Sequence, residues 1–178
     1  ITSVLLLLII SISLFYNKYV WLFFIIIVSL ILFIEFNNLT RKIWIKQKNT
    51  IAIVNTSSLL FLVILVLVCY DIYNKPPISL AFILLICIFS DTGGYVIGNL
   101  VGGKKLTKIS PKKTISGSIG SFIFSLIPLL IFWYYYKQNN DTNFYRDFSS
   151  LIPVTLFLSL ICQLGDLFIS YFKRMAKV

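Results

Sequence analysis

Two aspartates lie inside long apolar segments, where a carboxylate is energetically unfavourable. Asp91 follows the apolar run 80–89, and Asp166 lies near the end of the last apolar run. A charged side chain near the bilayer centre costs roughly 2.5–3.5 kcal/mol on insertion scales, so a bound cation is a natural compensation. The alternative for Asp91 is a buried hydrogen bond to a neighbouring helix.

A lysine-rich loop, residues 102–116, separates the two segments that carry these aspartates. It holds five lysines, with hydroxyl side chains between them and a proline that stiffens the turn. Thr114 or Ser116 could cap the helix predicted to follow, whose first N–H groups would favour an anion. Lysines, hydroxyls and a helix N-terminus are the ingredients of a phosphate site. An ordinary loop on the cytoplasmic side of a membrane is the alternative.

The last apolar run ends in a second polar cluster. Asp166, Ser170, Lys173 and Arg174 follow one another at spacings i, i+4, i+7 and i+8, so a helix places them on one face. The alternative is a set of basic residues that snorkel at the end of a membrane helix. Carboxylates hold Mg²⁺, and Mg²⁺ with lysines neutralises phosphate oxygens. Together with Asp91 and the loop, the pattern predicts a phosphoryl- or nucleotidyl-transfer site at a membrane surface.

Membrane-spanning helices must position these residues. Hydrophobic residues make up 58% of the 178-residue chain and charged residues 12%, against roughly 25% charged in globular proteins. Runs of about 20 apolar residues cross a bilayer, and the lipid forces each into a helix. We predict an all-α, polytopic transmembrane bundle of about six spans: 1–15, 19–36, 51–70, 78–100, 117–136 and 151–172. We also predict an N-terminal region, 1–75, and a catalytic-type region, 76–178.

The distribution of cations predicts the orientation. Most Lys and Arg residues lie between spans two and three, between spans four and five, or after span six. Because cytoplasmic loops carry the excess of Lys and Arg, these three regions face the cytoplasm. This placement explains much of the net charge of +10, and no nucleic-acid motif accompanies it.

Two other residue types limit the chemistry. The sequence has no histidine, so it offers no imidazole base and no histidine ligand for zinc. Cys69, Cys87 and Cys162 each lie within an apolar run and lack the spacing of metal ligands. They are interpreted as small apolar residues of membrane helices.

Small residues recur every four positions in two segments. The two series are Gly94, Gly98 and Gly102, and Gly117, Ser121 and Ser125. Each series lies on one helix face and allows another helix to approach closely. Backbone room for a phosphate is the alternative interpretation.

Three motifs resemble phosphatidate cytidylyltransferase, also called CDP-diacylglycerol synthase. They are SDTGGYVIGN at 90–99, KISPKKT at 108–114 and GDLFISYFKR at 165–174. The resemblance covers roughly residues 80–178. It implies that phosphatidic acid and CTP react, with Mg²⁺, to give CDP-diacylglycerol and pyrophosphate. The partners would be these two substrates and the membrane lipid, in the inner (plasma) membrane of a bacterium, and a homodimer is an open alternative.

The resemblance also implies roles for individual residues. Asp91 and Asp166 would shape a cation-binding polar cavity and, with Lys112 and Lys113, form the catalytic set. Phosphate contacts would come from the same lysines and from the remaining polar residues of the motifs. These are Ser110, Thr114, Ser170, Lys173 and Arg174.

The chain departs from the family pattern at its end. The family signature continues with a Lys-Asp pair, His-Gly-Gly and two further aspartates that are the main metal ligands, and the Lys-Asp pair is due directly after Val178. Glutamate is common in the family at positions 116 and 169, and arginine at 99. We therefore expect a fragment that is inactive alone, and a first helix whose beginning is missing. The alternatives are a transporter for an anionic substrate, with Asp91 as a proton or ion site, and a non-catalytic remnant of the enzyme.

Overall fold

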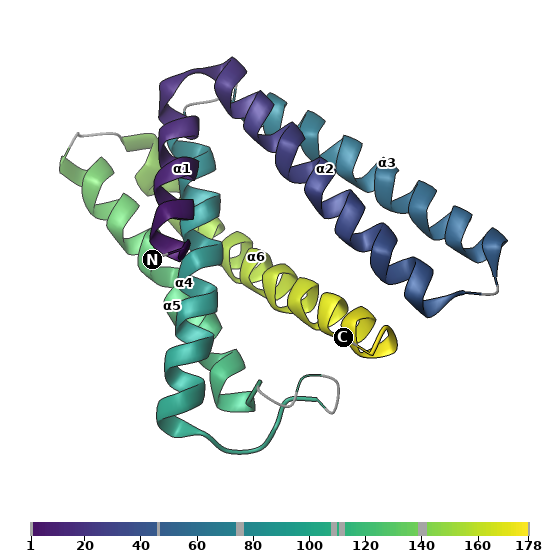
Figure 1. The fold of residues 1–178 in the computed structure, drawn as a ribbon. Coiled ribbons are helices and arrows are strands. Elements are labelled where there is room, and N and C mark those ends of the chain that lie inside the picture. Colours follow the sequence, from purple (N-terminus) through teal and green to yellow (C-terminus); the bar gives the residue numbers. More distant parts are fainter. Residues whose placement is uncertain are drawn as a thin grey trace. The chain divides into compact units, whose positions relative to one another are not determined.

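The protein is described by a computed structural model that covers residues 2–45, 47–73, 77–107, 110, 113–138 and 142–177. Its elements are six helices, and these residues contain no strand. The helices are α1 (Thr2–Tyr16), α2 (Lys18–Ile43), α3 (Lys48–Tyr73), α4 (Pro77–Val101), α5 (Ile115–Gln138) and α6 (Thr142–Met175) (Figure 1). The predicted all-helical polytopic class is confirmed.

The number of membrane spans differs from the prediction by one helix. In the described ranges, five helices, α2 to α6, are long and apolar enough to cross a membrane. Helix α1 has 15 residues and begins at Thr2, the second residue of the sequence. The expected first span at 1–15 is therefore a helix, but it is not one of these five candidates.

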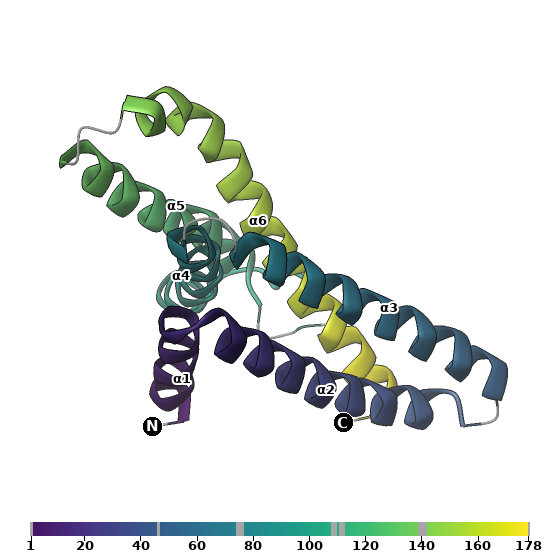
Figure 2. The ribbon, with the colours of Figure 1, turned by 90° about the horizontal axis from the view of Figure 1, so that it is seen from above.

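The chain divides into two compact units. The first comprises residues 1–81 and 175–178, and the second comprises residues 82–174. In the first unit, α2 and α3 run side by side in opposite directions (Figures 1 and 2). The side chain of Asn55 on α3 donates to Asn37 Oδ1 at 2.8 Å, and the buried Thr40 hydroxyl donates to Asn55 Oδ1 at 2.9 Å. Hydrogen bonds between membrane helices contribute about 0.6 kcal/mol each on average, so this cluster strengthens the pairing of α2 with α3.

In the second unit, glycines bring α4 and α5 into close contact. A Cβ atom added to Gly94 would lie 2.5 Å from Ser121 Oγ, and one added to Gly117 would lie 2.7 Å from the carbonyl oxygen of Gly94. Gly98 also faces Gly117, because its added Cβ would lie 3.5 Å from the Gly117 Cα. The small residues predicted to permit a close helix approach do so at these positions.

Gly102 is the exception in its series. It lies directly after the last residue of α4, has a φ of +63°, and has nothing within 4 Å of an added Cβ. Its N–H donates to the carbonyl oxygen of Gly98 at 3.1 Å. A glycine with positive φ is a common way to end a helix, so Gly102 terminates α4, and its predicted packing role is wrong.

Helices α4 and α6 are joined by short polar contacts. The hydroxyl oxygens of Ser90 and Ser159 lie 2.8 Å apart, and both residues are fully buried. The Sγ atoms of Cys87 and Cys162 lie 3.0 Å apart, and both thiols are free. These contacts place the region just before Asp91 against the middle of α6.

Candidate functional site

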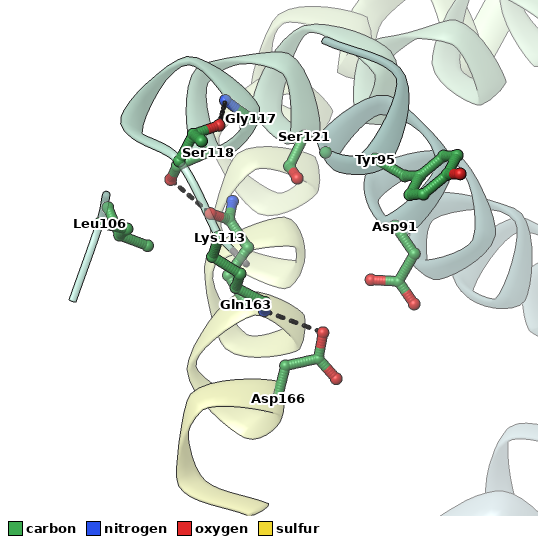
Figure 3. A pocket seen from close by; sticks show the side chains of 11 residues that line it. Asp91, Tyr95, Leu106, Lys113, Gly117, Ser118, Ser121, Gln163 and Asp166 are labelled. Carbon is green, nitrogen blue, oxygen red and sulfur yellow. Dashed lines mark hydrogen bonds and ion pairs between the residues drawn. The ribbon is translucent and has the colours of Figure 1, made fainter. Parts of the chain in front are cut away.

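A cavity of about 370 Å³ opens within the second unit. Helices α4, α5 and α6 all contribute to it, together with the loop that precedes α5 (Figure 3). The residues that line it are Asp91, Gly94, Tyr95, Leu106, Lys113, Thr114, Gly117, Ser118, Ser121, Gln163 and Asp166. The lining therefore includes residues from all three of the motifs that carry the family resemblance.

Asp91 and Asp166 face the same space from different helices. Asp91 extends from α4 and Asp166 from α6, and their carboxylates point into the cavity (Figure 3). Both side chains are exposed, and Asp91 interacts electrostatically with Asp166 and with Lys113. Two carboxylates that share a space repel one another unless a cation lies with them. The two acidic positions singled out in the sequence thus belong to one cluster.

The loop before α5 carries Lys113 to this cluster. It folds back on itself, because Leu106 N–H donates to the carbonyl oxygen of Lys113 at 2.8 Å and Ile115 N–H donates to that of Lys104 at 3.0 Å. Lys113 Nζ then forms an ion pair with Asp166 Oδ2 at 2.9 Å. The Asp166 side chain remains 53% exposed, so this pair leaves much of the carboxylate accessible to a ligand.

Thr114 caps helix α5. Its hydroxyl oxygen accepts from the N–H of Gly117 at 3.0 Å. Ser116 gives its proton to the carbonyl oxygen of Gly102, so in the 3.0 Å contact between Thr114 and Ser116 the Thr114 hydroxyl is the donor. The Thr114 hydroxyl thus donates its one proton to Ser116 and accepts from Gly117 N–H. Its observed role is therefore to cap the helix. Its predicted phosphate contact stays a prediction.

The start of α5 is less open to an anion than the sequence suggested. The N–H groups of Ile115 and Gly117 are bonded to Lys104 and Thr114, and that of Ser118 to the Thr114 carbonyl. These donors stabilise the loop and the helix end. Among the described residues that line the cavity, the positive charge comes from the Lys113 side chain.

The other predicted residues lie outside the cavity lining or outside the described structure. Ser110 forms the turn before Lys113, and its carbonyl oxygen accepts from Lys113 N–H at 3.1 Å. On α6, Ser170 is half-buried, whereas Lys173 and Arg174 are exposed. Lys112 lies outside the described residues. The roles of all five remain predictions.

The cavity also contains polar residues that the sequence did not single out as binding residues. The Ser118 hydroxyl on α5 donates to Gln163 Oε1 on α6, and Ser121 and Tyr95 complete this part of the wall. Gln163 precedes Asp166 by three residues, which places both on adjacent turns of one helix face. The sequence could have indicated Gln163 in this way, because a polar amide inside an apolar run needs a hydrogen-bond partner and Gln163 lies one turn before Asp166.

The donor set is compatible with Mg²⁺. The described residues contain no cluster of three or more acidic, cysteine or histidine side chains, so Asp91 and Asp166 are the carboxylates that they offer here. Proteins usually bind Mg²⁺ through one or two carboxylates, with water and substrate phosphates completing the shell. Two exposed carboxylates beside a lysine meet that requirement.

Comparison with known proteins agrees with the resemblance that the three motifs indicated. Residues 45–178 match the model of the cytidylyltransferase family. The chain is 40% identical over 106 residues to the phosphatidate cytidylyltransferase of Staphylococcus aureus strain COL, covering 59% of this chain and 38% of that protein. It is 42% identical over 91 residues to that of Staphylococcus haemolyticus, covering 51% of this chain and 33% of that protein. The matched part of the chain thus spans only 33–38% of the length of these relatives. No solved structure matches it.

Proposed function

The chain belongs to the cytidylyltransferase family, and on this premise we propose that it is part of a phosphatidate cytidylyltransferase. In the proposed reaction, a phosphate oxygen of phosphatidic acid attacks the α-phosphorus of CTP. The bond between that phosphorus and the oxygen bridging to the β-phosphate breaks, so that CDP-diacylglycerol forms and pyrophosphate leaves.

One observation supports this proposal most strongly. Asp91, Asp166 and Lys113 come from three separate parts of the sequence and meet at one cavity among helices long enough to cross a membrane. A lipid phosphate and a nucleotide triphosphate both require neutralisation of negative charge, and a cavity between membrane helices suits a lipid substrate. The proposal of an enzyme is therefore favoured over that of a transporter.

The residues of the chain would act mainly by positioning and by electrostatics. Asp91 and Asp166 would hold Mg²⁺, which supplies positive charge to the phosphate oxygens as they react. Lys113, now paired with Asp166 at 2.9 Å, would be shared with a phosphate oxygen once the substrate enters. No side chain needs to act as a nucleophile, because the lipid phosphate performs the attack. Catalysis of this kind depends on holding the two substrates in line.

The proposed location is the inner membrane of a bacterium, with the lysine-rich loop at the cytoplasmic surface. The two carboxylates and Lys113 lie together, so the positive-inside rule that places the loop in the cytoplasm also places the cavity near that side. CTP would enter from the cytoplasm and phosphatidic acid from the bilayer.

A reconstituted assay tests the proposal. Protein expressed from the complete reading frame, in vesicles that contain phosphatidic acid, should release pyrophosphate when CTP and Mg²⁺ are both present. Asp166→Asn should lower this rate by about 10²-fold or more, as expected when a group that stabilises transition-state charge is removed. Asp71→Asn is the matched control, since Asp71 is an exposed aspartate at the end of α3.

Two outcomes would contradict the proposal, and a third would contradict the role of Asp166. Pyrophosphate release that does not depend on phosphatidic acid would remove the lipid as acceptor. A protein that shows no CTP turnover but carries an anionic solute into sealed vesicles would be a transporter. An Asp166→Asn rate equal to that of Asp71→Asn would exclude Asp166 from the chemistry.

A further inference from the structure

Gln163 carries an unused hydrogen-bond donor at the cavity. Its Oε1 accepts the proton of the Ser118 hydroxyl. Its Nε2 is buried and has no hydrogen-bond partner among the described residues. The side chain lines the cavity between Ser118 and Ser121 on one side and Asp166 on the other (Figure 3). The amide is thus held at one end and unsatisfied at the other.

This arrangement is unfavourable unless a ligand completes it. A buried N–H group without an acceptor loses its hydration and gains nothing in return. With the Ser118 proton given to Oε1, Nε2 is the free end of the amide in this arrangement. The donor is therefore orientated before any ligand arrives, as expected of a binding residue.

The surroundings of Nε2 indicate the kind of acceptor. Ser118 and Ser121 are uncharged, and Lys113, the cation that the described residues contribute to the lining, is engaged with Asp166. A charged phosphate oxygen is best placed beside Lys113, since a charge desolvated next to neutral groups alone is strongly disfavoured. A neutral carbonyl oxygen suits a single neutral N–H donor.

We propose that Gln163 is a specificity-determining residue whose amide N–H binds a carbonyl oxygen of a substrate, with Ser118 as the residue that orientates it. This inference rests on the proposed function, in which two substrates carry such an oxygen. They are the cytosine ring of CTP and the fatty-acyl esters of phosphatidic acid. The shared chemistry is one uncharged acceptor that receives one N–H.

Kinetics of Gln163 variants test the inference. Gln163→Leu and Gln163→Met both remove the N–H donor with little change in volume, and neither adds a negative charge to the cavity that Asp91 and Asp166 line. Both should raise the KM for one substrate by roughly 5- to 20-fold, the effect of one lost hydrogen bond. The kcat should change by less than the KM. Ser118→Ala should give a smaller rise in the same KM, because it removes only the orientation.

The pattern of KM values identifies the acceptor. A rise for CTP assigns the bond to the base, and a rise for phosphatidic acid assigns it to the lipid. An ether-linked phosphatidic acid, which lacks the ester carbonyls, provides a second experiment on the same question. If the lipid carries the acceptor, the KM of the wild-type protein for the ether lipid should be raised. It should equal the KM of the Gln163→Leu protein for the ester lipid.

Melting temperature separates binding from packing. Gln163→Leu should melt at or above the wild-type temperature, because it removes an unsatisfied buried donor. Unchanged KM values for both substrates in both Gln163 variants, in a wild-type background that is active, would overturn the inference. Wild-type protein without CTP turnover would instead refute the proposed function, so the two failures are distinct.

Discussion

Substitution of Gly120 by alanine tests whether the close approach of α4 and α5 builds the site. Gly120 is buried on α5 and does not line the cavity. A Cβ atom at this position would lie 2.5 Å from Ile97 Cβ and 2.8 Å from the carbonyl oxygen of Gly93. Both obstacles belong to α4 and are fixed to its backbone, so a side-chain rotation cannot relieve them.

The expected size of the effect follows from these distances. Contacting carbon atoms normally lie about 3.5–4.0 Å apart, so the two helices must separate by roughly 1 Å at this point. Overpacking of this kind costs about 1–3 kcal/mol of stability. It also moves Asp91, two residues before Gly93, away from the α5 side of the cavity. A displacement of about 1 Å can lower a catalytic rate by about 10²-fold.

Two measurements on detergent-solubilised protein check this prediction. Gly120→Ala should lower the melting temperature and should reduce pyrophosphate release by about ten- to a hundredfold. Gly165→Ala is the matched control for stability, because an added Cβ there meets nothing within 4 Å. It should melt no lower than wild type. A Gly120→Ala protein that melts and turns over like wild type would refute the proposed dependence of the site on this helix contact.

Two further predictions concern the thiol contact and the helix cap. Copper–phenanthroline oxidation should join Cys87 to Cys162, whose Sγ atoms lie 3.0 Å apart, and mass spectrometry of the alkylated peptides should find Cys69 still free. Recovery of both thiols unlinked would contradict the pairing of α4 with α6. Thr114→Val should destabilise the protein by about 0.5–2 kcal/mol through loss of the cap, whereas Thr114→Ser should not. Equal melting temperatures for the two Thr114 variants would argue against capping.

The helical fold was predictable because hydropathy acts locally. An apolar run of sufficient length must form a helix in lipid, whatever its neighbours are. The glycine spacing also predicted a helix contact, and the structure places Gly94 and Gly117 at that contact. Gly102 was misjudged because spacing alone does not show where a helix stops. Its positive φ of +63° is a property of the chain end and not of the four-residue repeat.

The candidate site was predictable in part. Asp91 and Asp166 stood out because carboxylates are rare in apolar runs, and both line the cavity. The contact of Gln163 with Ser118 links residues 45 positions apart. It depends on how α5 and α6 pack, which no local pattern encodes. The same holds for the ion pair of Lys113 with Asp166, since any lysine of the loop offered the same charge.

The transfer rates of three variants test most directly whether Asp91 and Asp166 serve one site. Asp91→Asn, Asp166→Asn and the double variant would be assayed with labelled CTP, phosphatidic acid and excess Mg²⁺. A shared site predicts that the double variant is about as slow as the slower single variant, because either change disables the same cluster. A double variant slowed by the product of the two single factors would show that the carboxylates act independently, which contradicts a common site.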